Sequence, residues 1–320
     1  MRRPIFVRTS TVRFAHRLLI LGLIGLVTSF SSSFADSSRQ AAKKISRSNS
    51  ERSQTRSADR VDSRFIQVYP LPSDESGLKR STEQTRAVIL IHGLQVHPIS
   101  NLQVNKAAFK SWQKPHSSMV DALAAEADVF AFAYSENGTL PEIVSASGLR
   151  DDVAKLEELG YAEVVLVGHS AGGLVARHFV EDYPDAGVTK VVQICTPNNG
   201  ASCANMDAGV RKNQRPFLHC LTKEGRAVCL LERADKKIPP SVQFVCVIGD
   251  GMGSGDFLVS NASQWPKDLQ DQGIPALALH TTHFTVMHSK AQTQKIAEVV
   301  RENIARWNEI QVASMKKSLK

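Results

Sequence analysis

The chain has 320 residues, of which 42% are hydrophobic and 22% are charged. This is the composition of an ordinary globular protein, and it excludes a fibrous or a wholly disordered chain. The formal net charge is +8, but the basic excess lies in the first 64 residues. Residues 65–320 are close to neutral, so the folded part has no charge pattern typical of nucleic-acid binding, and we expect no nucleic-acid partner.

The first 35 residues have the pattern of a secretory signal peptide. Five arginines precede an apolar run at residues 18–27, and small residues then lead to Ala35. A membrane-spanning helix needs about 20 apolar residues, which favours cleavage near Ala35 over retention as an anchor. We therefore expect an exported protein, either periplasmic or secreted.

Residues 36–64 are rich in serine and arginine and contain almost no large apolar side chain. Such a segment buries too little surface to offset the entropy of ordering, so we expect a disordered linker. A solvated tether is the favoured interpretation, and a weak contact with an anionic envelope polymer is the alternative. The folded domain is predicted to span residues 65–320.

Strand-like and helix-like segments alternate along this domain. Short β-branched and apolar runs predict strands at residues 65–69, 87–91, 128–134, 163–167, 188–194 and 242–248. Apolar residues at three- and four-residue spacing predict helices at residues 118–127, 148–159, 172–182 and 290–307. The alternation predicts an α/β fold with a mainly parallel sheet and helices on both faces. Ligands bind such sheets at the carboxyl ends of the strands, so residues that follow a strand are the candidates for function.

A G-x-S-x-G motif follows the strand predicted at residues 163–167 and precedes a predicted helix. Its residues are Gly168, His169, Ser170, Ala171 and Gly172. The glycines remove side chains that would collide with the strand and the helix, so the serine can occupy a strained turn at a helix amino terminus. This context predicts that Ser170 is a catalytic nucleophile.

A serine nucleophile needs a histidine later in the chain as its base. Three histidines cluster just before the last predicted helix. We predict that His283 is the base, and His288 is the main alternative. His280 directly follows an apolar run at residues 275–279, so we interpret it as a strand-end residue.

The third member of a triad is an acid that orients and stabilises the histidine. Two aspartates follow the strand predicted at residues 242–248. We favour Asp256, because its glycine-rich approach lets it turn back toward the histidine loop. Asp250 precedes a glycine, which is typical of a turn residue, and it stays the alternative.

Two backbone N–H groups are predicted to bind an oxyanion. One belongs to Ala171, the residue after the nucleophile, and the other to Leu94, in the loop after the strand at residues 87–91. We interpret His92, in the same loop, as a residue that shapes the loop, with direct participation as the alternative.

All five cysteines lie beyond the predicted cleavage site: Cys195, Cys203, Cys220, Cys229 and Cys246. In an oxidising compartment an odd count leaves at least one thiol unpaired or paired between chains. We expect a bridge within the polar segment that holds the middle three, and buried thiols at the other two. The spacing does not indicate a metal site.

These motifs resemble the lipase and esterase branch of the α/β-hydrolase superfamily, which includes the bacterial triacylglycerol lipases. The resemblance covers about residues 65–307. It rests on Ile91-His92-Gly93, on the G-x-S-x-G motif, on the turn Thr196-Pro197-Asn198-Asn199-Gly200, and on Gly255-Asp256 followed by a late histidine. One departure is that the turn has Asn where many lipases have His, which leaves the substrate class open.

The resemblance implies an α/β-hydrolase fold and an ester-hydrolysing triad of Ser170, Asp256 and His283, with no cofactor. The implied partner is a small-molecule or lipid ester substrate. Residues 201–240, called the insertion below, stand where this fold carries a lid, and a surface excursion without a substrate role is the alternative. An acyltransferase with the same triad and a catalytically silent binding protein are the alternative functions, because fold alone does not decide between them.

Overall fold

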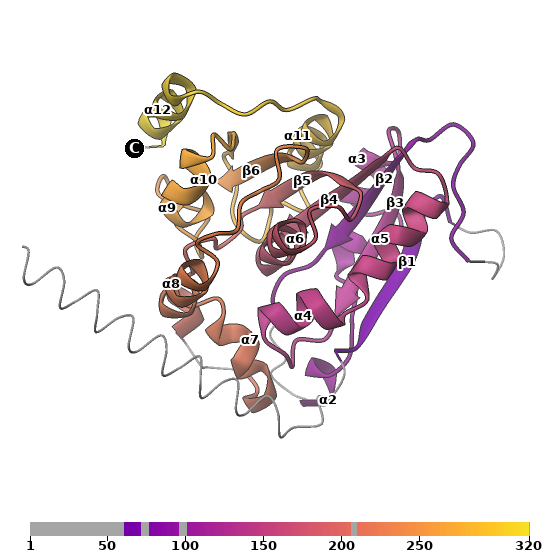
Figure 1. Ribbon diagram of the computed structural model, residues 1–320, viewed down its shortest axis with the longest axis horizontal. Coiled ribbons are helices and arrows are strands. Elements are labelled where there is room, and N and C mark those ends of the chain that lie inside the picture. Colours follow the sequence, from indigo (N-terminus) through magenta and orange to yellow (C-terminus); the bar gives the residue numbers. More distant parts are fainter. Residues whose placement is uncertain (1–60, 72–76, 96–100, 206–209, 320) are drawn as a thin grey trace, which may run out of the picture. The chain divides into compact units, whose positions relative to one another are not determined.

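The computed structural model describes residues 61–71, 77–95, 101–205 and 210–319. The predicted signal segment and nearly all of the predicted linker lie outside these residues. The strands are β1 (Ser63–Tyr69), β2 (Arg86–Ile91), β3 (Asp128–Tyr134), β4 (Glu163–His169), β5 (Val188–Ile194), β6 (Gln243–Gly249) and β7 (Ala276–Leu279). They form a seven-stranded sheet in the order β1-β3-β2-β4-β5-β6-β7 (Figure 1). β1 is antiparallel to β3, and every other neighbouring pair is parallel.

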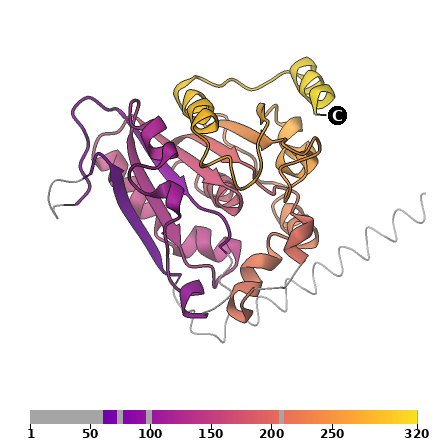
Figure 2. The same ribbon diagram turned by 180° about the vertical axis from the view of Figure 1, so that it is seen from behind.

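Helices cover both faces of this sheet. α4, α5 and α6 lie on the side that faces the viewer in Figure 1, and α3 and α11 come to the front in Figure 2. The helices are α2 (Asn101–Val104), α3 (Ser118–Leu123), α4 (Leu140–Ala146), α5 (Leu149–Glu158), α6 (Ala171–Asp182), α7 (Arg215–His219), α8 (Lys223–Glu232), α9 (Asn261–Gln264), α10 (Lys267–Asp271), α11 (Lys290–Arg301) and α12 (Glu309–Ser318). The described residues also form the short 3-10 helices η1 (Ser111–Gln113), η2 (Ser202–Asn205) and η3 (Lys212–Gln214).

The two faces of the sheet belong to two separate hydrophobic clusters. In β2, Ile89 and Ile91 join the cluster that contains α4, α5 and α6, while Val88 and Leu90 join the cluster that contains α3 and α11. Successive side chains of a strand point to opposite faces, so an uninterrupted apolar run supplies both clusters. This is why the central strands carry no polar alternation.

The predicted mainly parallel sheet with helices on both faces is confirmed. Each of the six predicted strands forms, and β7 forms within the apolar run at residues 275–279. The last predicted helix is too long, because α11 ends at Arg301 and Glu302 is extended. The reason is tertiary: the N–H of Ile304 donates to the side chain of Gln243 at 2.8 Å, and the N–H of Trp307 donates to the carbonyl of Gly273 at 2.7 Å.

The insertion contains η2, η3, α7 and α8 and lies between β5 and β6. Its second half is anchored in the core by Arg226, which is fully buried. The Arg226 Nε donates to the carbonyl of Asn198 at 2.9 Å, and its Nη1 donates to His178 Nε2 at 3.1 Å. Burial lowers the pKa of His178 well below its ordinary value, and the nearby Arg226 lowers it further, so a neutral imidazole accepts this bond.

All five cysteines are free thiols in the structure, so the bridge that we expected within the insertion is not formed. Cys195 and Cys246 are buried, as expected. The other three thiols lie on the insertion and are partly exposed, and they form no disulfide with one another.

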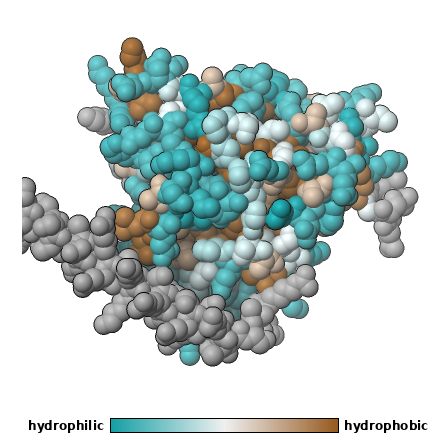
Figure 3. Space-filling view, in the orientation of Figure 1, coloured by the Kyte–Doolittle hydropathy of each residue, from teal (hydrophilic) through white to brown (hydrophobic). Residues whose placement is uncertain are grey.

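The surface of the described part is mixed. Hydrophobic residues form small patches among hydrophilic ones on the face shown in Figure 3, and the exposed large apolar side chains include Leu231 of α8 and Ile310 of α12. Within the described ranges, no helix has both the length and the apolar content needed to cross a bilayer.

Candidate active site

Ser170 occupies a strained turn between β4 and α6. Its φ of 55° and ψ of −126° lie outside the regions that residues with a side chain usually adopt. The turn is held by the Ser170 N–H, which donates to the carbonyl of Ile194 at 2.8 Å. The side chain therefore projects at the carboxyl end of β4, next to the free N–H groups of the α6 amino terminus.

The two glycines of the G-x-S-x-G motif are required by close packing. A Cβ atom at Gly168 would lie 2.4 Å from the carbonyl oxygen of Gly172. A Cβ atom at Gly172 would lie 2.2 Å from the carbonyl oxygen of Ile91. Both distances are far below van der Waals contact, so the motif fits this turn for a steric reason.

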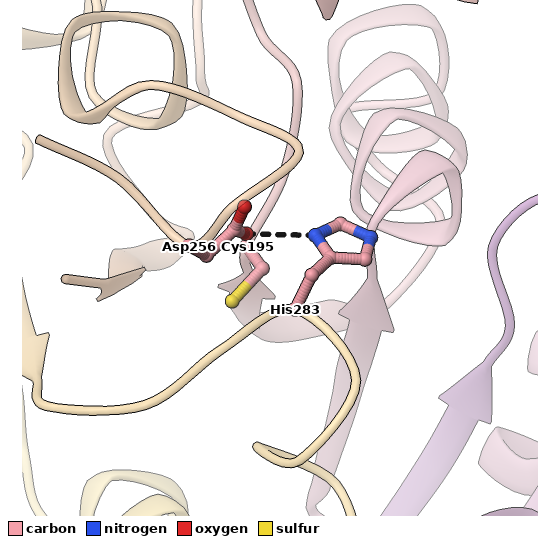
Figure 4. A group of neighbouring side chains, drawn as sticks. All are labelled: Cys195, Asp256 and His283. Carbon is pink, nitrogen blue, oxygen red and sulfur yellow. Dashed lines mark hydrogen bonds and ion pairs between the residues drawn. The ribbon is translucent and has the colours of Figure 1, made fainter. Parts of the chain in front are cut away.

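Asp256 and His283 form a buried hydrogen-bonded pair (Figure 4). Asp256 Oδ2 accepts from His283 Nδ1 at 2.7 Å, and the backbone N–H of His283 donates to the carbonyl of Asp256 at 2.9 Å. Asp256 is fully buried and His283 is 6% exposed. The second carboxylate oxygen, Oδ1, accepts the N–H groups of Leu258 and Val259 at 2.9 and 2.7 Å. With Nδ1 donating to Asp256, the other ring nitrogen of His283 is left to accept a proton and points away from Asp256 in Figure 4.

The alternative residues lie elsewhere. Asp250 Oδ1 accepts from the side chain of Asn261 at 2.9 Å, as a turn residue does. His280 and His288 are both exposed. The structure thus brings Asp256 and His283 together, while their catalytic roles stay a prediction.

His169 links the Ser170 turn to the loop of His283. Its Nε2 donates to the carbonyl of His283 at 3.0 Å, and the two imidazole rings lie 4.8 Å apart between centroids. Burial lowers the pKa of His169 well below its ordinary value, and His283 lowers it further. A neutral His169 with its proton on Nε2 therefore holds the backbone of His283 next to the Ser170 turn, because Ser170 directly follows His169. Sequence reasoning assigned His169 no role, because the middle positions of the motif are variable.

The loop after β2 packs directly on the Ser170 turn. A Cβ atom at Gly93 would lie 2.6 Å from Ser170 Cβ and 3.1 Å from the backbone nitrogen of Ala171. Leu94 follows Gly93 and is partly buried. The loop that carries Leu94 and the amino terminus of α6 that carries Ala171 therefore meet beside Ser170, where a pair of oxyanion donors is needed.

His92 shapes this loop. It is 1% exposed, and its Nδ1 donates to the carbonyl of Gly93 at 2.8 Å. Its Nε2 accepts the backbone N–H of Tyr134 at 3.3 Å, and the two rings are stacked at 4.4 Å. Both ring nitrogens are thus engaged in holding the backbone.

Cys195 lies beside the Asp256 and His283 pair and was not assigned to the site from the sequence. It is fully buried, and its φ is 52°. Its Sγ lies with a carboxylate oxygen of Asp256 and a ring nitrogen of His283 in a group whose members are within 4.8 Å of one another (Figure 4). Burial raises the pKa of the Cys195 thiol well above its ordinary value, and the Asp256 carboxylate raises it further, so Cys195 is a protonated donor toward Asp256. The three side chains could hold a metal ion only if the Asp256 to His283 hydrogen bond were broken, so the geometry favours proton transfer.

Asn198, in the turn that departs from the common lipase pattern, points into the core. It is fully buried, its Nδ2 donates to Gln193 Oε1 at 2.9 Å and to the carbonyl of Gln264 at 3.0 Å, and its Oδ1 accepts from Arg177 at 3.2 Å. The residue thus connects β5, α6 and α9. These buried hydrogen bonds explain why an amide side chain stands at this position, and no role in substrate binding is needed.

Comparison with known proteins places this site in a family. Two solved forms of the lipase BlEst2 of Bacillus licheniformis share the fold. The mature form has a TM-score of 0.54 and 14% identity, over 74% of this chain and 97% of that one. The propeptide form has a TM-score of 0.56 and 14% identity, over 72% of this chain and 53% of that one.

No curated protein matches the sequence. The model of the "Alpha/beta hydrolase family" matches residues 88–283. This span runs from within β2 through β7 and includes the Ser170 turn, the insertion, and the Asp256 and His283 pair. The chain therefore belongs to the alpha/beta hydrolase family.

Proposed function

We propose that this hydrolase is an exported serine esterase or lipase that cleaves carboxylic ester bonds through Ser170, His283 and Asp256. The observation that carries the proposal is the buried hydrogen bond between Asp256 and His283, in a loop fixed by His169 to the strained Ser170 turn. A serine, a histidine and an acid in this arrangement are the machinery of acyl transfer.

In the first half of the reaction, His283 Nε2 takes the proton of the Ser170 hydroxyl as Oγ attacks the ester carbonyl carbon. The Asp256 carboxylate stabilises the imidazolium that forms. The N–H groups of Leu94 and Ala171 bind the developing oxyanion. Collapse of the tetrahedral intermediate passes the proton from His283 to the leaving alcohol and leaves an acyl-enzyme on Ser170.

In the second half, His283 takes a proton from water, and the hydroxide that results attacks the acyl carbonyl. Collapse releases the carboxylic acid and returns the proton to Ser170 Oγ. The same steps with an alcohol in place of water would transfer the acyl group instead. No described contact selects the alcohol over water.

The ester substrate class is supported by chemistry and by analogy of fold. The triad acts on acyl carbonyls, and the structural neighbour BlEst2 is named a lipase. Gln214 of the insertion donates to the carbonyl of Gln95, the residue after Leu94, which supports a part of the insertion in shaping the substrate site.

The proposal is tested by hydrolysis of p-nitrophenyl acetate and octanoate with the wild type and Ser170→Ala. We expect turnover by the wild type and a loss of roughly 10⁴-fold or more in kcat for the variant. Ser260→Ala, which changes a hydroxyl that caps α9, is the control and should keep its activity. Absence of turnover by the folded wild type would favour a binding protein, and ester formation with added alcohol in preference to hydrolysis would favour an acyltransferase.

Export is proposed from residues 1–35 alone. The amino terminus of protein recovered from the periplasm or the medium of a bacterial host should begin near Asp36. Recovery of the chain only from the cytoplasm, with residues 2–35 intact, would contradict it.

A further inference from the structure

Glu136 is a carboxyl group buried beside the proposed active site, and the triad does not use it. It follows β3 and is 2% exposed. Its Oε1 accepts the backbone N–H of Gln95 at 2.8 Å, and its own N–H donates to the carbonyl of Val104 at 2.9 Å. Glu136 therefore holds the loop that carries Leu94 from one side, at the residue directly after Leu94.

Gln214 of η3 completes this arrangement from the insertion. It is fully buried, and its Nε2 donates to the carbonyl of Gln95 at 2.5 Å and to Glu136 Oε2. The peptide groups on both sides of the Gln95 Cα are thus bound, one by Glu136 and the other by Gln214. We call these three residues the Glu136 bridge.

A second contact between the same segments supports the bridge. Asn213 Nδ2, next to Gln214, donates to Asn105 Oδ1 at 2.7 Å, and η3 packs against α2. The insertion therefore meets the segment downstream of the β2 loop at two neighbouring points. This end of the insertion is joined to the loop of Leu94 rather than lying free above it.

Among the described residues, Lys110, Tyr134 and His92 carry titratable groups that face Glu136. The Lys110 ammonium and the Tyr134 hydroxyl interact with it electrostatically, and His92 Nδ1 lies 3.9 Å from Oε1. Burial raises the pKa of Glu136 to about 8, although Lys110 and the bonds from Gln95 and Gln214 act in the opposite direction. Both ring nitrogens of His92 hydrogen-bond to the backbone, and the positive charge of Lys110 acts on Glu136.

We propose that the Glu136 bridge is a positioning device for the oxyanion site: Gln214 of the insertion and Glu136 together fix the Gln95 peptide, and through it the N–H of Leu94. This inference rests on the proposed function, because the N–H of Leu94 matters only if an oxyanion forms beside Ser170. It assigns the insertion a specific task in catalysis, which is to complete the support of the oxyanion loop.

The physical reason is pre-organisation. A backbone N–H stabilises a developing negative charge only if it already points at the oxyanion position, because reorientation during the reaction costs free energy. Leu94 sits between Gly93, which packs on Ser170, and Gln95, which the bridge holds. Without the bridge, the carbonyl and N–H of Gln95 lose buried partners, and the loop becomes free to turn the Leu94 N–H away.

The test uses two variants that break the bridge and one that preserves part of it. Gln214→Met keeps the side-chain volume and removes both hydrogen bonds, and Glu136→Met removes the acceptor for the Gln95 N–H. Glu136→Gln keeps an oxygen for that N–H. Lys212→Ala, exposed on η3, and Asp128→Asn, a buried acid at the opposite end of β3, are the matched controls.

Hydrogen exchange of the peptide that contains residues 92–95 is measured first, since it requires no activity. We expect faster exchange in Gln214→Met and Glu136→Met, and exchange close to the wild type in Glu136→Gln and both controls. We also expect kcat for p-nitrophenyl ester hydrolysis to fall roughly 10- to 100-fold in the two Met variants. This loss is smaller than the loss caused by removing one oxyanion donor outright, because the Leu94 N–H is misplaced and not removed. The KM should change little, and Glu136→Gln should recover most of kcat.

Two results would overturn the inference. One is unchanged exchange of the 92–95 peptide in folded Gln214→Met and Glu136→Met. The other is faster exchange with an unchanged kcat, which would make the bridge a support of the insertion alone. A wild type that exchanges as expected but hydrolyses no ester would instead contradict the proposed function, so the two failures are distinguishable.

Discussion

At the scale of single residues, the site depends on how Asp256 holds His283. The carboxylate uses Oδ2 for the imidazole and Oδ1 for two backbone N–H groups, so its orientation is fixed from both sides. Cys195 adds a thiol that burial and the carboxylate keep protonated. In the proposed mechanism, this fixed, buried acid keeps the histidine proton on Nδ1 and leaves Nε2 to act as the base.

Asp256→Asn tests this role. The amide keeps the size of the side chain, but its NH₂ group cannot accept the Nδ1 proton, and the histidine is expected to take the wrong tautomer. We predict a loss of roughly 10³- to 10⁴-fold in kcat at pH 7, measured by p-nitrophenyl ester hydrolysis. Asp250→Asn is the matched control, because Asp250 bonds Asn261, and it should retain most of its activity. An equal loss in the two variants would contradict the assignment of Asp256.

Sequence reasoning reached some of these residues and missed others for a physical reason. The Ser170 turn was predictable because its glycines are dictated by local sterics, and Asp256 and His283 were ranked first because chain order and loop position favoured them. His169 and Cys195 were missed, because their roles depend on contacts with His283 and Asp256, more than 60 positions away in the sequence. No local pattern marks such contacts.

At the scale of elements, the strands of the sheet were predictable because each is a short run rich in β-branched and apolar residues. The end of α11 was not predictable, because side chains of distant elements bind the backbone where this helix ends. Lys190, for example, is buried in β5 and donates its Nζ to the carbonyls of Val300 and Glu302, at 2.7 and 2.6 Å, at the end of α11. A lysine within a strand gives no sign in the sequence that it caps a helix.

The attachment of α8 to the core also belongs to this scale. Arg226 crosses from α8 to Asn198 and His178, which fixes the second half of the insertion on α6, the helix that follows Ser170. We infer that any movement of the insertion leaves α8 in place. A lid that moved as a whole would have to expose a buried guanidinium and the partners that it leaves behind.

Arg226→Ala tests the attachment. The variant leaves a cavity and two buried acceptors without a donor, so we predict a loss of about 2–4 kcal/mol in the free energy of unfolding. The measurement is urea denaturation followed by circular dichroism. Lys223→Ala, on the exposed side of the same helix, should change the stability by less than about 0.5 kcal/mol. A similar small change in Arg226→Ala would show that the insertion is not anchored there.

At the scale of the whole molecule, the buried Glu136 makes stability depend on pH. Its pKa is raised by burial to about 8 in the folded chain, whereas an unfolded chain releases the proton near pH 4.3. Between these values the folded state binds the proton and the unfolded state does not, so this group stabilises the fold at low pH and the contribution is lost as the pH rises toward about 8.

Glu136→Gln should remove this dependence. Relative to the variant, the wild type is expected to lose free energy of unfolding steadily between about pH 5 and about pH 8. Urea denaturation of both proteins across that range measures the difference. The titration of groups that do not interact with Glu136 cancels in it, whereas Lys110, which interacts with Glu136, contributes to it. Stability curves that run parallel from pH 5 to pH 8 would show that Glu136 is already ionised in the folded chain.

The chain is a hydrolase in which Ser170, Cys195 and Asp256 follow the parallel strands β4, β5 and β6 at one edge of the sheet. The central claim is that Ser170 is the nucleophile, and labelling of the folded protein with a fluorophosphonate probe tests it most directly. We predict that peptide mass spectrometry will find the probe on Ser170, and that Asp256→Asn will label more slowly than the wild type. Labelling of a different residue, or no labelling of a protein that is folded by circular dichroism, would contradict the account.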